Sequence, residues 1–393
     1  MVQCKSRRLF VMFGFFGVMF IVFSVFAGIG FYIAHRIYHG LVCFIPNLPF
    51  WPVLVIQLIL SLILILGFGR SMMPLSGEVK QVLGIISAYC MGIFIYLLFF
   101  TVVADVLLLV LRLLKGSVIA GQPVRGYVTL GVLLLTVVTC LYGFINARQI
   151  DHVSYEVNLP GKTDISDMKI VLISDLHLGA VGSEGRLKKV VEEINELNPD
   201  VVCIAGDFFD TDYATIRDPE AAIETLQGIR SNFGVYACLG NHDAGQTIGQ
   251  MTAFLEQAGI QALNDAYTII DDRLVLVGRL DAYPIGGYGE YKRKGLPDFL
   301  EVENPTLPVI VMDHNPAHID SYGTEVDLIL SGHTHKGQVF PANLVTNAMY
   351  AVDYGYYQKD VQSPHVIVTS GVGYWGMPMR VGTDCEIVSI RIQ

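Results

Sequence analysis

The chain has 393 residues, of which 52% are hydrophobic and only 16% are charged, and its formal net charge is −10. This composition is too apolar for a single soluble domain and indicates that part of the chain lies in a membrane. The negative charge, together with the absence of any run of lysines or arginines, argues against a nucleic-acid-binding protein.

Four apolar segments in residues 1–148 are predicted to cross the bilayer. Three of them are uncharged stretches long enough for a hydrocarbon core of about 30 Å. The third segment belongs to a longer apolar stretch, residues 82–114, which is too long for one upright span and too short for two. We therefore end this crossing at residue 104 and expect the remainder to continue as an interfacial helix. The predicted spans are residues 9–34, 50–69, 82–104 and 126–145.

Asp105 is the acidic residue that directly follows the third predicted span. We expect it to lie near the membrane interface; the alternative is a polar site within the helix bundle. A transporter with an appended domain is disfavoured, because four spans with almost no internal charge offer few groups to line a path.

The orientation in the membrane stays open between two interpretations. Lys5, Arg7 and Arg8 precede the first span and favour a cytoplasmic amino terminus. With four spans, the carboxyl-terminal part would then be cytoplasmic as well. Against this, the same count places the basic loop at residues 112–125 outside, and the amino terminus also resembles a twin-arginine export signal.

From Asn146 onward the composition becomes that of an ordinary globular protein. Residues 149–167 are predicted to be a polar connector that includes a strand-like stretch, and residues 168–393 to be one domain. In this domain short apolar runs, each followed by a polar tip, alternate with amphipathic helical patterns. This alternation is typical of a layered α/β domain. The predicted strands are 170–173, 201–205, 235–239, 274–277, 309–312, 328–330, 366–369 and 386–392, and the predicted helices are 186–197, 220–229 and 251–258.

Side chains of metal-ligand type follow five of these strands. Because ligands bind at the carboxyl ends of strands in open α/β sheets, we expect the five loops to converge on one site. Seven candidate ligands exceed what one four-coordinate ion needs, and they suit a pair of ions that shares a bridging carboxylate. The candidates are Asp175, His177, Asp207, Asn241, His314, His333 and His335.

The sequence also predicts the backbone conformation of the loops that carry these candidate ligands. Asp175 and His177 are two residues apart, so in extended backbone their side chains would point the same way. Glycines at positions 206, 240 and 332 immediately precede three of the clusters, and we expect them to allow the sharp turns that aim the side chains into a common cleft.

The motifs Asp-X-His, Gly-Asp-X-X-Asp, Gly-Asn-His-Asp, a lone His and Gly-His-X-His occur in this order, each after a strand. In this combination residues 168–393 resemble the calcineurin-like metallophosphoesterase family. With the membrane region, the chain is similar to the membrane-anchored bacterial, YkuE-type branch. The resemblance implies a four-layer α-β-β-α sandwich and a metal-dependent hydrolase of phosphoester or pyrophosphate bonds. Some relatives cleave the pyrophosphate of a UDP-linked diacylglucosamine; one such class has Arg at the position of His242.

The resemblance also implies a role for each site residue. Asp207 would bridge two divalent ions, and His242 would protonate the leaving group. Asp243 would orient His242 by accepting a hydrogen bond from it, and Asp210 would brace the loop. The absence of thiolates favours manganese, iron or zinc, with manganese preferred. One ion would be held by Asp175, His177 and His335, and the other by Asn241, His314 and His333.

The expected reaction is hydrolysis in which a hydroxide that bridges the two ions attacks phosphorus in line, while His242 donates a proton. The substrate is expected to be lipid-linked or nucleotide-linked, and the membrane anchor favours the lipid-linked form. A soluble phosphodiester reached from the aqueous side is the alternative within this class. The competing class is a non-catalytic membrane module that keeps the metal site for binding or regulation. A degenerate module would lack a ligand or the proton donor, whereas here every position is filled.

Two further hypotheses concern the substrate cleft. Arg380 would pair with a second phosphate of the substrate. Aromatic residues at 283–291, 354–357 and 374–375 would line a lipid-facing cleft, although such stretches more often serve loop packing.

Overall fold

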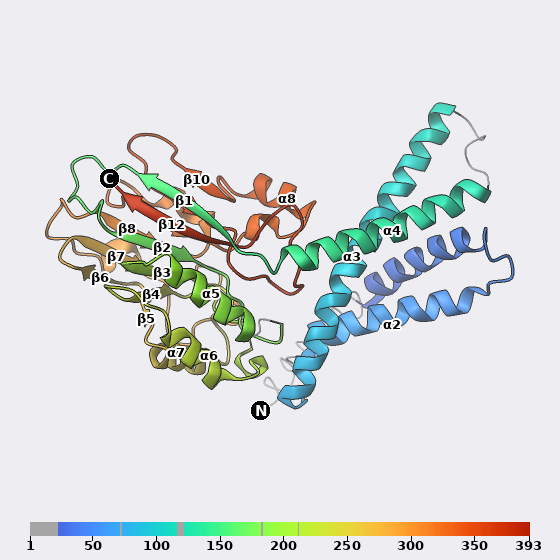
Figure 1. The fold of residues 1–393 in the computed structure, drawn as a ribbon, viewed down its shortest axis with the longest axis horizontal. Coiled ribbons are helices and arrows are strands. Elements are labelled where there is room, and N and C mark those ends of the chain that lie inside the picture. Colours follow the sequence, from blue (N-terminus) through green and yellow to red (C-terminus); the bar gives the residue numbers. More distant parts are fainter. Residues whose placement is uncertain (1–22, 71–72, 116–121, 182–183, 211) are drawn as a thin grey trace, which may run out of the picture. The chain divides into compact units, whose positions relative to one another are not determined.

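The computed structural model of the chain describes residues 23–70, 73–115, 122–181, 184–210 and 212–393. These residues fall into two compact units (Figure 1). The helical unit comprises the described residues up to Leu75 together with Leu83–Leu141. The α/β unit comprises Ser76–Val82 together with Tyr142–Gln393.

Three helices of the described chain are long and apolar enough to cross a membrane, by length and composition. They are α2 (Phe50–Phe68), α3 (Gly77–Lys115) and α4 (Gln122–Asn146). Helices α2 and α4 coincide closely with the predicted spans 50–69 and 126–145. The count in the described residues is therefore three rather than the predicted four. The first predicted span, residues 9–34, begins outside the described residues, and the described chain there is helical over residues 23–41.

Helix α3 is longer than the predicted crossing of residues 82–104. It runs without interruption to Lys115, so the stretch that was expected to trail along the interface is part of the same helix. The reason is local: residues 106–114 are leucine and valine with one arginine, and neither proline nor glycine is present to end the helix.

The α/β unit contains two six-stranded sheets. The first has the order β1-β12-β2-β3-β4-β5, in which β2 to β5 are parallel and β12 runs antiparallel to β2. Strands such as β3 are buried along their whole length, as expected when both faces of a sheet are covered. The bounds are β1 Asp151–Val157, β2 Lys169–Ile173, β3 Val201–Ala205, β4 Val235–Cys238, β5 Gln261–Ala262 and β12 Glu386–Ile392.

The second sheet has the order β10-β11-β9-β8-β7-β6. Its four central strands are parallel, and both edge strands are antiparallel to their neighbours. The bounds are β6 Ala266–Ile270, β7 Leu274–Gly278, β8 Val309–Met312, β9 Leu328–Ser331, β10 Gly355–Tyr357 and β11 His365–Val368.

Three apolar cores hold these layers together. The two sheets pack face to face through residues such as Leu172 and Met312. The outer face of the first sheet is covered by α5 (Glu184–Glu196), α6 (Pro219–Gln227) and α7 (Ile248–Gln257) (Figure 1). In the described chain the outer face of the second sheet is instead covered by loops and two short 3₁₀ helices, η4 (Leu296–Asp298) and η5 (Pro316–Ser321). The α/β domain is thus confirmed, but the second outer layer of the predicted sandwich is thin, because glycines and prolines interrupt residues 284–308.

All eight predicted strands of this domain are present, each within one residue of its predicted ends. The prediction missed β5, β6, β10 and helix α8 (Ala342–Met349). Strand β1 lies in the predicted connector and pairs in parallel with β12 over seven residues. The connector therefore contributes the edge strand of the first sheet.

Candidate metal centre

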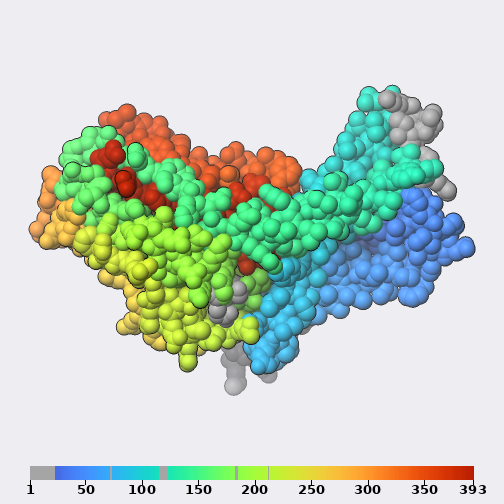
Figure 2. Space-filling view, in the orientation of Figure 1, coloured from blue at the N-terminus to red at the C-terminus, as the bar shows by residue number. Residues whose placement is uncertain are grey.

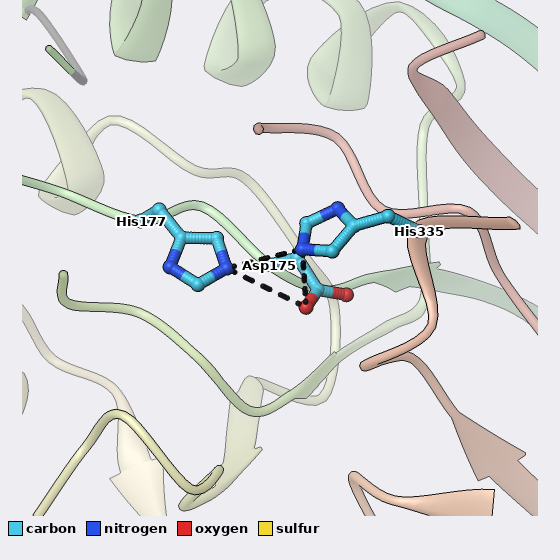
Figure 3. A group of neighbouring side chains, drawn as sticks. All are labelled: Asp175, His177 and His335. Atoms are coloured by element: carbon cyan, nitrogen blue, oxygen red, sulfur yellow. Dashed lines mark hydrogen bonds and ion pairs between the residues drawn. The ribbon is translucent and has the colours of Figure 1, made fainter. Parts of the chain in front are cut away.

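Asp175, His177 and His335 converge on one point (Figure 3). Nε2 of His177 lies 3.2 Å from Nε2 of His335, and Oδ1 of Asp175 lies 3.7 Å and 3.4 Å from these two nitrogens. Ligand atoms that each bind a divalent ion at about 2.1 Å are separated by roughly 3.0–3.5 Å. Oδ1 of Asp175 is buried without a hydrogen-bond partner in the described chain. The three side chains therefore fit one divalent ion.

A second group is formed by Asp207, His314 and His333. Nε2 of His314 lies 3.1 Å from Oδ2 of Asp207 and 3.3 Å from Nδ1 of His333. Nδ1 of His314 lies 2.7 Å from the carbonyl oxygen of Ala205 and donates to it. This hydrogen bond fixes the imidazole so that Nε2 faces the group, which is how metal-binding histidines are commonly oriented.

Asp207 lies between the two groups. Its Oδ2 is 3.1 Å from Nε2 of His314 on one side and 3.7 Å from Nε2 of His177 on the other. Asn241 is buried, and its Oδ1 has no hydrogen-bond partner among the described residues. This is expected of an oxygen that serves as a metal ligand. The structure thus assembles two ligand groups around one shared carboxylate.

The backbone at these ligands is not extended. Asp175 and His177 have φ values of +57° and +47°, and Asp207, His333 and His335 also lie in the left-handed region. The expectation that Asp175 and His177 share a direction through extended backbone is therefore wrong. Their amides donate instead to the carbonyls of Gly206 and residue 207, each at 3.0 Å, which holds the two loops together. Non-glycine residues with positive φ typically mark functional sites.

The glycines beside the ligands act mainly by lacking a side chain. Gly206 has φ of +79°, in agreement with the predicted turn. Gly332 does not have positive φ, but a Cβ there would overlap the hydroxyl of Ser174 and the carboxylate of Asp175. Gly240 is equally close to Asp207. At positions 240 and 332 glycine is thus required for close approach rather than for a turn.

The electrostatics of the site favour cations. Burial lowers the pKa of His333 to about 4, and burial also lowers the pKa of His335. Both imidazoles are therefore neutral near pH 7, as ligation requires. Burial alone would raise the pKa of Asp207, but the neighbouring His314 lowers it well below the usual range. Burial alone would likewise raise the pKa of Asp175, but the neighbouring His335 lowers it. Two ionised carboxylates thus lie beside these neutral imidazoles, whereas at His177 and His314 burial would lower the pKa but the carboxylates raise it.

His242 stands beside the first group. Its ring centroid is 5.1 Å from that of His177 and 6.0 Å from that of Trp375, and its amide donates to Oδ1 of Asp207 at 2.9 Å. Burial lowers the pKa of His242. Asp210 also approaches, since it offers an oxygen within 4.8 Å of ligand-type nitrogens of His177 and His242. A role of Asp210 beyond bracing the loop was not predicted.

Asp243 has a different role from the predicted one. It is fully buried, and its two oxygens accept hydrogen bonds from the amides of Phe209 and Gly240, each at 2.9 Å. Burial, followed by the charge of Asp207, raises the pKa of Asp243 to about 7. Because both oxygens serve the main chain, Asp243 ties the loop after β3 to the loop after β4 and does not orient His242.

Arg380 is likewise placed differently. It is fully buried and donates to the carbonyl oxygens of His335, Ser370 and Gly373 at 3.0, 2.7 and 2.6 Å. Its guanidinium also lies 3.2 Å from Nδ1 of His335. A side chain in this position cannot reach a substrate phosphate, so the predicted substrate contact is corrected. Arg380 supports the ligand His335 from behind.

Replacing Arg380 with methionine is expected to weaken metal binding about 10–100-fold, the usual cost of losing a group that orients a ligand. The carbonyls that Arg380 satisfies would be left buried and unpaired, so the thermal unfolding midpoint should fall as well. Metal affinity would be measured by competition with a chelating dye. Arg391→Met, on the exposed side of β12, is the matched control; equal affinity in the two variants would contradict this role.

One supporting residue was missed. Asp313, buried directly before His314, accepts hydrogen bonds from Arg293 at 2.6 Å and from the hydroxyl of Tyr322 at 2.7 Å. Its carbonyl accepts a hydrogen bond from Ser331 at 2.6 Å. These contacts fix the backbone that carries His314. An acidic residue next to a candidate ligand is the signal in the sequence, but its partner Arg293 lies in a long loop with no regular pattern.

The chain is similar to several known proteins. Residues 168–337 match the family model described as calcineurin-like phosphoesterase. A zebrafish (Danio rerio) protein named transmembrane protein with metallophosphoesterase domain is 31% identical over 369 residues, covering 88% of this chain and 82% of its own. An uncharacterized metallophosphoesterase of Helicobacter pylori is 31% identical, over 58% of this chain and 60% of its own.

A more distant relative has a named substrate. The UDP-2,3-diacylglucosamine pyrophosphatase LpxG of Chlamydia trachomatis is 27% identical, over 56% of this chain and 82% of its own. The similarity to the zebrafish protein extends over most of both chains. Similar proteins are therefore found in an animal as well as in bacteria.

Proposed function

This chain belongs to the calcineurin-like phosphoesterase family, and on that premise we propose that it is a membrane-anchored, dinuclear metal-dependent hydrolase of a phosphoester or pyrophosphate bond. The observation that carries the proposal is the position of Asp207, whose Oδ2 lies within 4 Å of a histidine nitrogen from each of the two ligand groups. In this proposal residues 1–148 anchor the protein in the cell membrane, residues 168–393 catalyse the reaction, and the catalytic domain faces the cytoplasm.

The site residues of the chain have two proposed roles, metal binding and proton donation. Asp175, His177 and His335 would hold one ion, and Asn241, His314 and His333 the other. When bound, two divalent ions supply Lewis acidity toward the phosphoryl group and lower the pKa of water; manganese, iron and zinc fit this set of nitrogen and oxygen donors, with manganese preferred. His242, beside the first group, would deliver a proton to the departing oxygen.

A lipid-linked substrate is supported by the surface near the site. Helix α8 lies on the surface of the α/β unit (Figure 2) and buries none of its residues. Leu344, Val345 and Met349 are 61%, 57% and 70% exposed, and residues 338–352 include no charged side chain. Tyr350, which follows α8, has its ring 6.2 Å from that of His333. An uncharged apolar helix beside a phosphate-cleaving site suits an acyl chain.

The relative LpxG, by its name, acts on a diacylated nucleotide sugar. Of the aromatic residues that were predicted to line a lipid-facing cleft, Trp375 is 45% exposed and lies near His242. We therefore propose a substrate that joins a phosphoester or pyrophosphate to a lipid. A nucleotide-linked substrate without acyl chains is the alternative.

The test is hydrolysis by purified, manganese-loaded protein of bis-p-nitrophenyl phosphate, p-nitrophenyl phosphate, a nucleotide-sugar pyrophosphate and a lipid-linked pyrophosphate. We expect turnover of the lipid-linked substrate to fall about tenfold in Leu344→Gln/Met349→Gln, because two apolar contacts are lost. Turnover of bis-p-nitrophenyl phosphate should not change. Val361→Gln, another exposed apolar position, is the matched control.

Other results would redirect the proposal. An equal effect of the α8 variant on all four substrates would argue against lipid recognition there. Absence of turnover on every substrate, with two metals bound per chain, would favour the non-catalytic module.

A further inference from the structure

The helical unit contains a polar cluster that the proposed hydrolysis does not use. Arg36 lies on the helix of residues 23–41, Asp105 on α3, and Arg125 in the first turn of α4. Together with His39, these side chains line one partly open cavity with about 30 Å³ of space for water-sized molecules. The rest of the lining is apolar apart from the hydroxyls of Thr101 and Thr129.

Asp105 is already satisfied within this cluster. Its Oδ1 forms an ion pair with Arg36, and its Oδ2 accepts a hydrogen bond from the hydroxyl of Tyr32 at 2.7 Å. Asp105 thus occupies a polar site between helices, which was the alternative to a place at the interface. Both of its oxygens are used, and none of these contacts involves Arg125.

Arg125 has no such partner. Within the described chain it makes neither a hydrogen bond nor an ion pair, although it lines the same cavity as Arg36 and Asp105. The cavity therefore contains two guanidinium groups and one carboxylate, so these groups give it a net positive charge. A guanidinium beside apolar helices needs an anion, because leaving it unpaired at the edge of the hydrocarbon is costly.

The two arginines are held in place by close helix packing. A Cβ at Gly40, four residues after Arg36, would overlap the side chain of Thr129 on α4. A Cβ at Gly126, next to Arg125, would overlap Phe44. The end of the first helix and the beginning of α4 therefore touch through glycines. This packing holds together the helix ends that carry the two arginines of the cavity before any ligand arrives.

We propose that this cluster is a binding site for a phosphate group, with Arg125 as its principal contact and with Arg36 and His39 beside it. A planar guanidinium presents paired donors that match two phosphate oxygens. Arg36 lies near the end of its helix and Arg125 near the start of α4, the level at which lipid headgroups meet a spanning helix. The phosphate comes from a phospholipid headgroup or from solution, and the chemistry of recognition is the same.

The test uses the full chain in detergent with EDTA present, so that the metal centre does not contribute. The shift of the thermal unfolding midpoint is titrated with dioctanoyl phosphatidylglycerol, with inorganic phosphate and with dioctanoylglycerol, which lacks phosphate. Arg125→Gln should weaken phosphatidylglycerol binding about tenfold or more, the value of one charged hydrogen-bonding contact. Arg112→Gln, an exposed arginine on α3 outside the cavity, is the matched control and should bind as the unaltered chain does.

The three probes separate the outcomes. Saturable binding of phosphatidylglycerol but not of inorganic phosphate assigns the site to lipid, and equal binding of both assigns it to free phosphate. Unchanged affinity in Arg125→Gln, or equally tight binding of dioctanoylglycerol, would overturn the proposal. Because no step depends on the metals, this result is independent of whether the chain is a hydrolase.

Discussion

Replacing Asp207 with alanine is expected to abolish hydrolysis of every substrate and to lower the bound metal from about two ions per chain to fewer than one. Its Oδ2 lies within 4 Å of a histidine nitrogen from each ligand group, so a single truncation removes a ligand from both. It also removes the negative charge that attracts a cation to His314. Burial alone would lower the pKa of His314, and this charge raises it. His314 would then be a poorer site for any cation.

Asp207→Asn removes the negative charge of the side chain and keeps its shape. The amide keeps an oxygen that can accept the hydrogen bond of the His242 amide, so the local fold should persist. If bridging by a charged oxygen is what matters, both variants lose metal and activity, as read by elemental analysis and by initial rates on bis-p-nitrophenyl phosphate. Asp320→Ala, at an exposed ion pair, is the control. Full metal content in Asp207→Asn would show that charge at this position is dispensable.

Much of this domain follows from local sequence. Runs such as 201–205 are apolar and β-branched because both sheet faces are covered, and their boundaries are sharp because glycine and aspartate follow. The ligand types were predictable for the same reason, since polar residues directly after buried strands have to meet at one edge of the sheets. The edge strand β6 is half-exposed and the strand β5 has only two residues, so neither carries an apolar run.

The roles of Asp243 and Arg380 could not be predicted, because they depend on burial between distant segments. Arg380 follows a glycine- and proline-rich stretch that looks exposed, yet it is enclosed by carbonyl oxygens from residues 335, 370 and 373. Asp243 lies next to His242 in sequence, but its oxygens are taken by amides at positions 209 and 240. Adjacency in sequence predicted a hydrogen bond that the turn geometry excludes.

Replacing His242 with alanine is expected to lower turnover about 10²–10⁴-fold on a substrate with a poor leaving group, the range for loss of a general acid, while both metals stay bound. His242 is not a member of either ligand group around Asp207, so metal content should match that of the unaltered chain. With p-nitrophenolate, which departs without a proton, the loss should be about tenfold at most.

The pH dependence gives an independent check of the same role. A general acid acts only when protonated, and burial lowers the pKa of His242. Turnover of the poor-leaving-group substrate by the unaltered chain should therefore fall as the pH rises through that pKa. His242→Ala should lose this slope, whereas Asp243→Asn, which alters only the supporting loop, should keep it. Loss of both metals in His242→Ala, or an equal loss on both leaving groups, would place His242 among the structural ligands and leave the proton to be delivered by water.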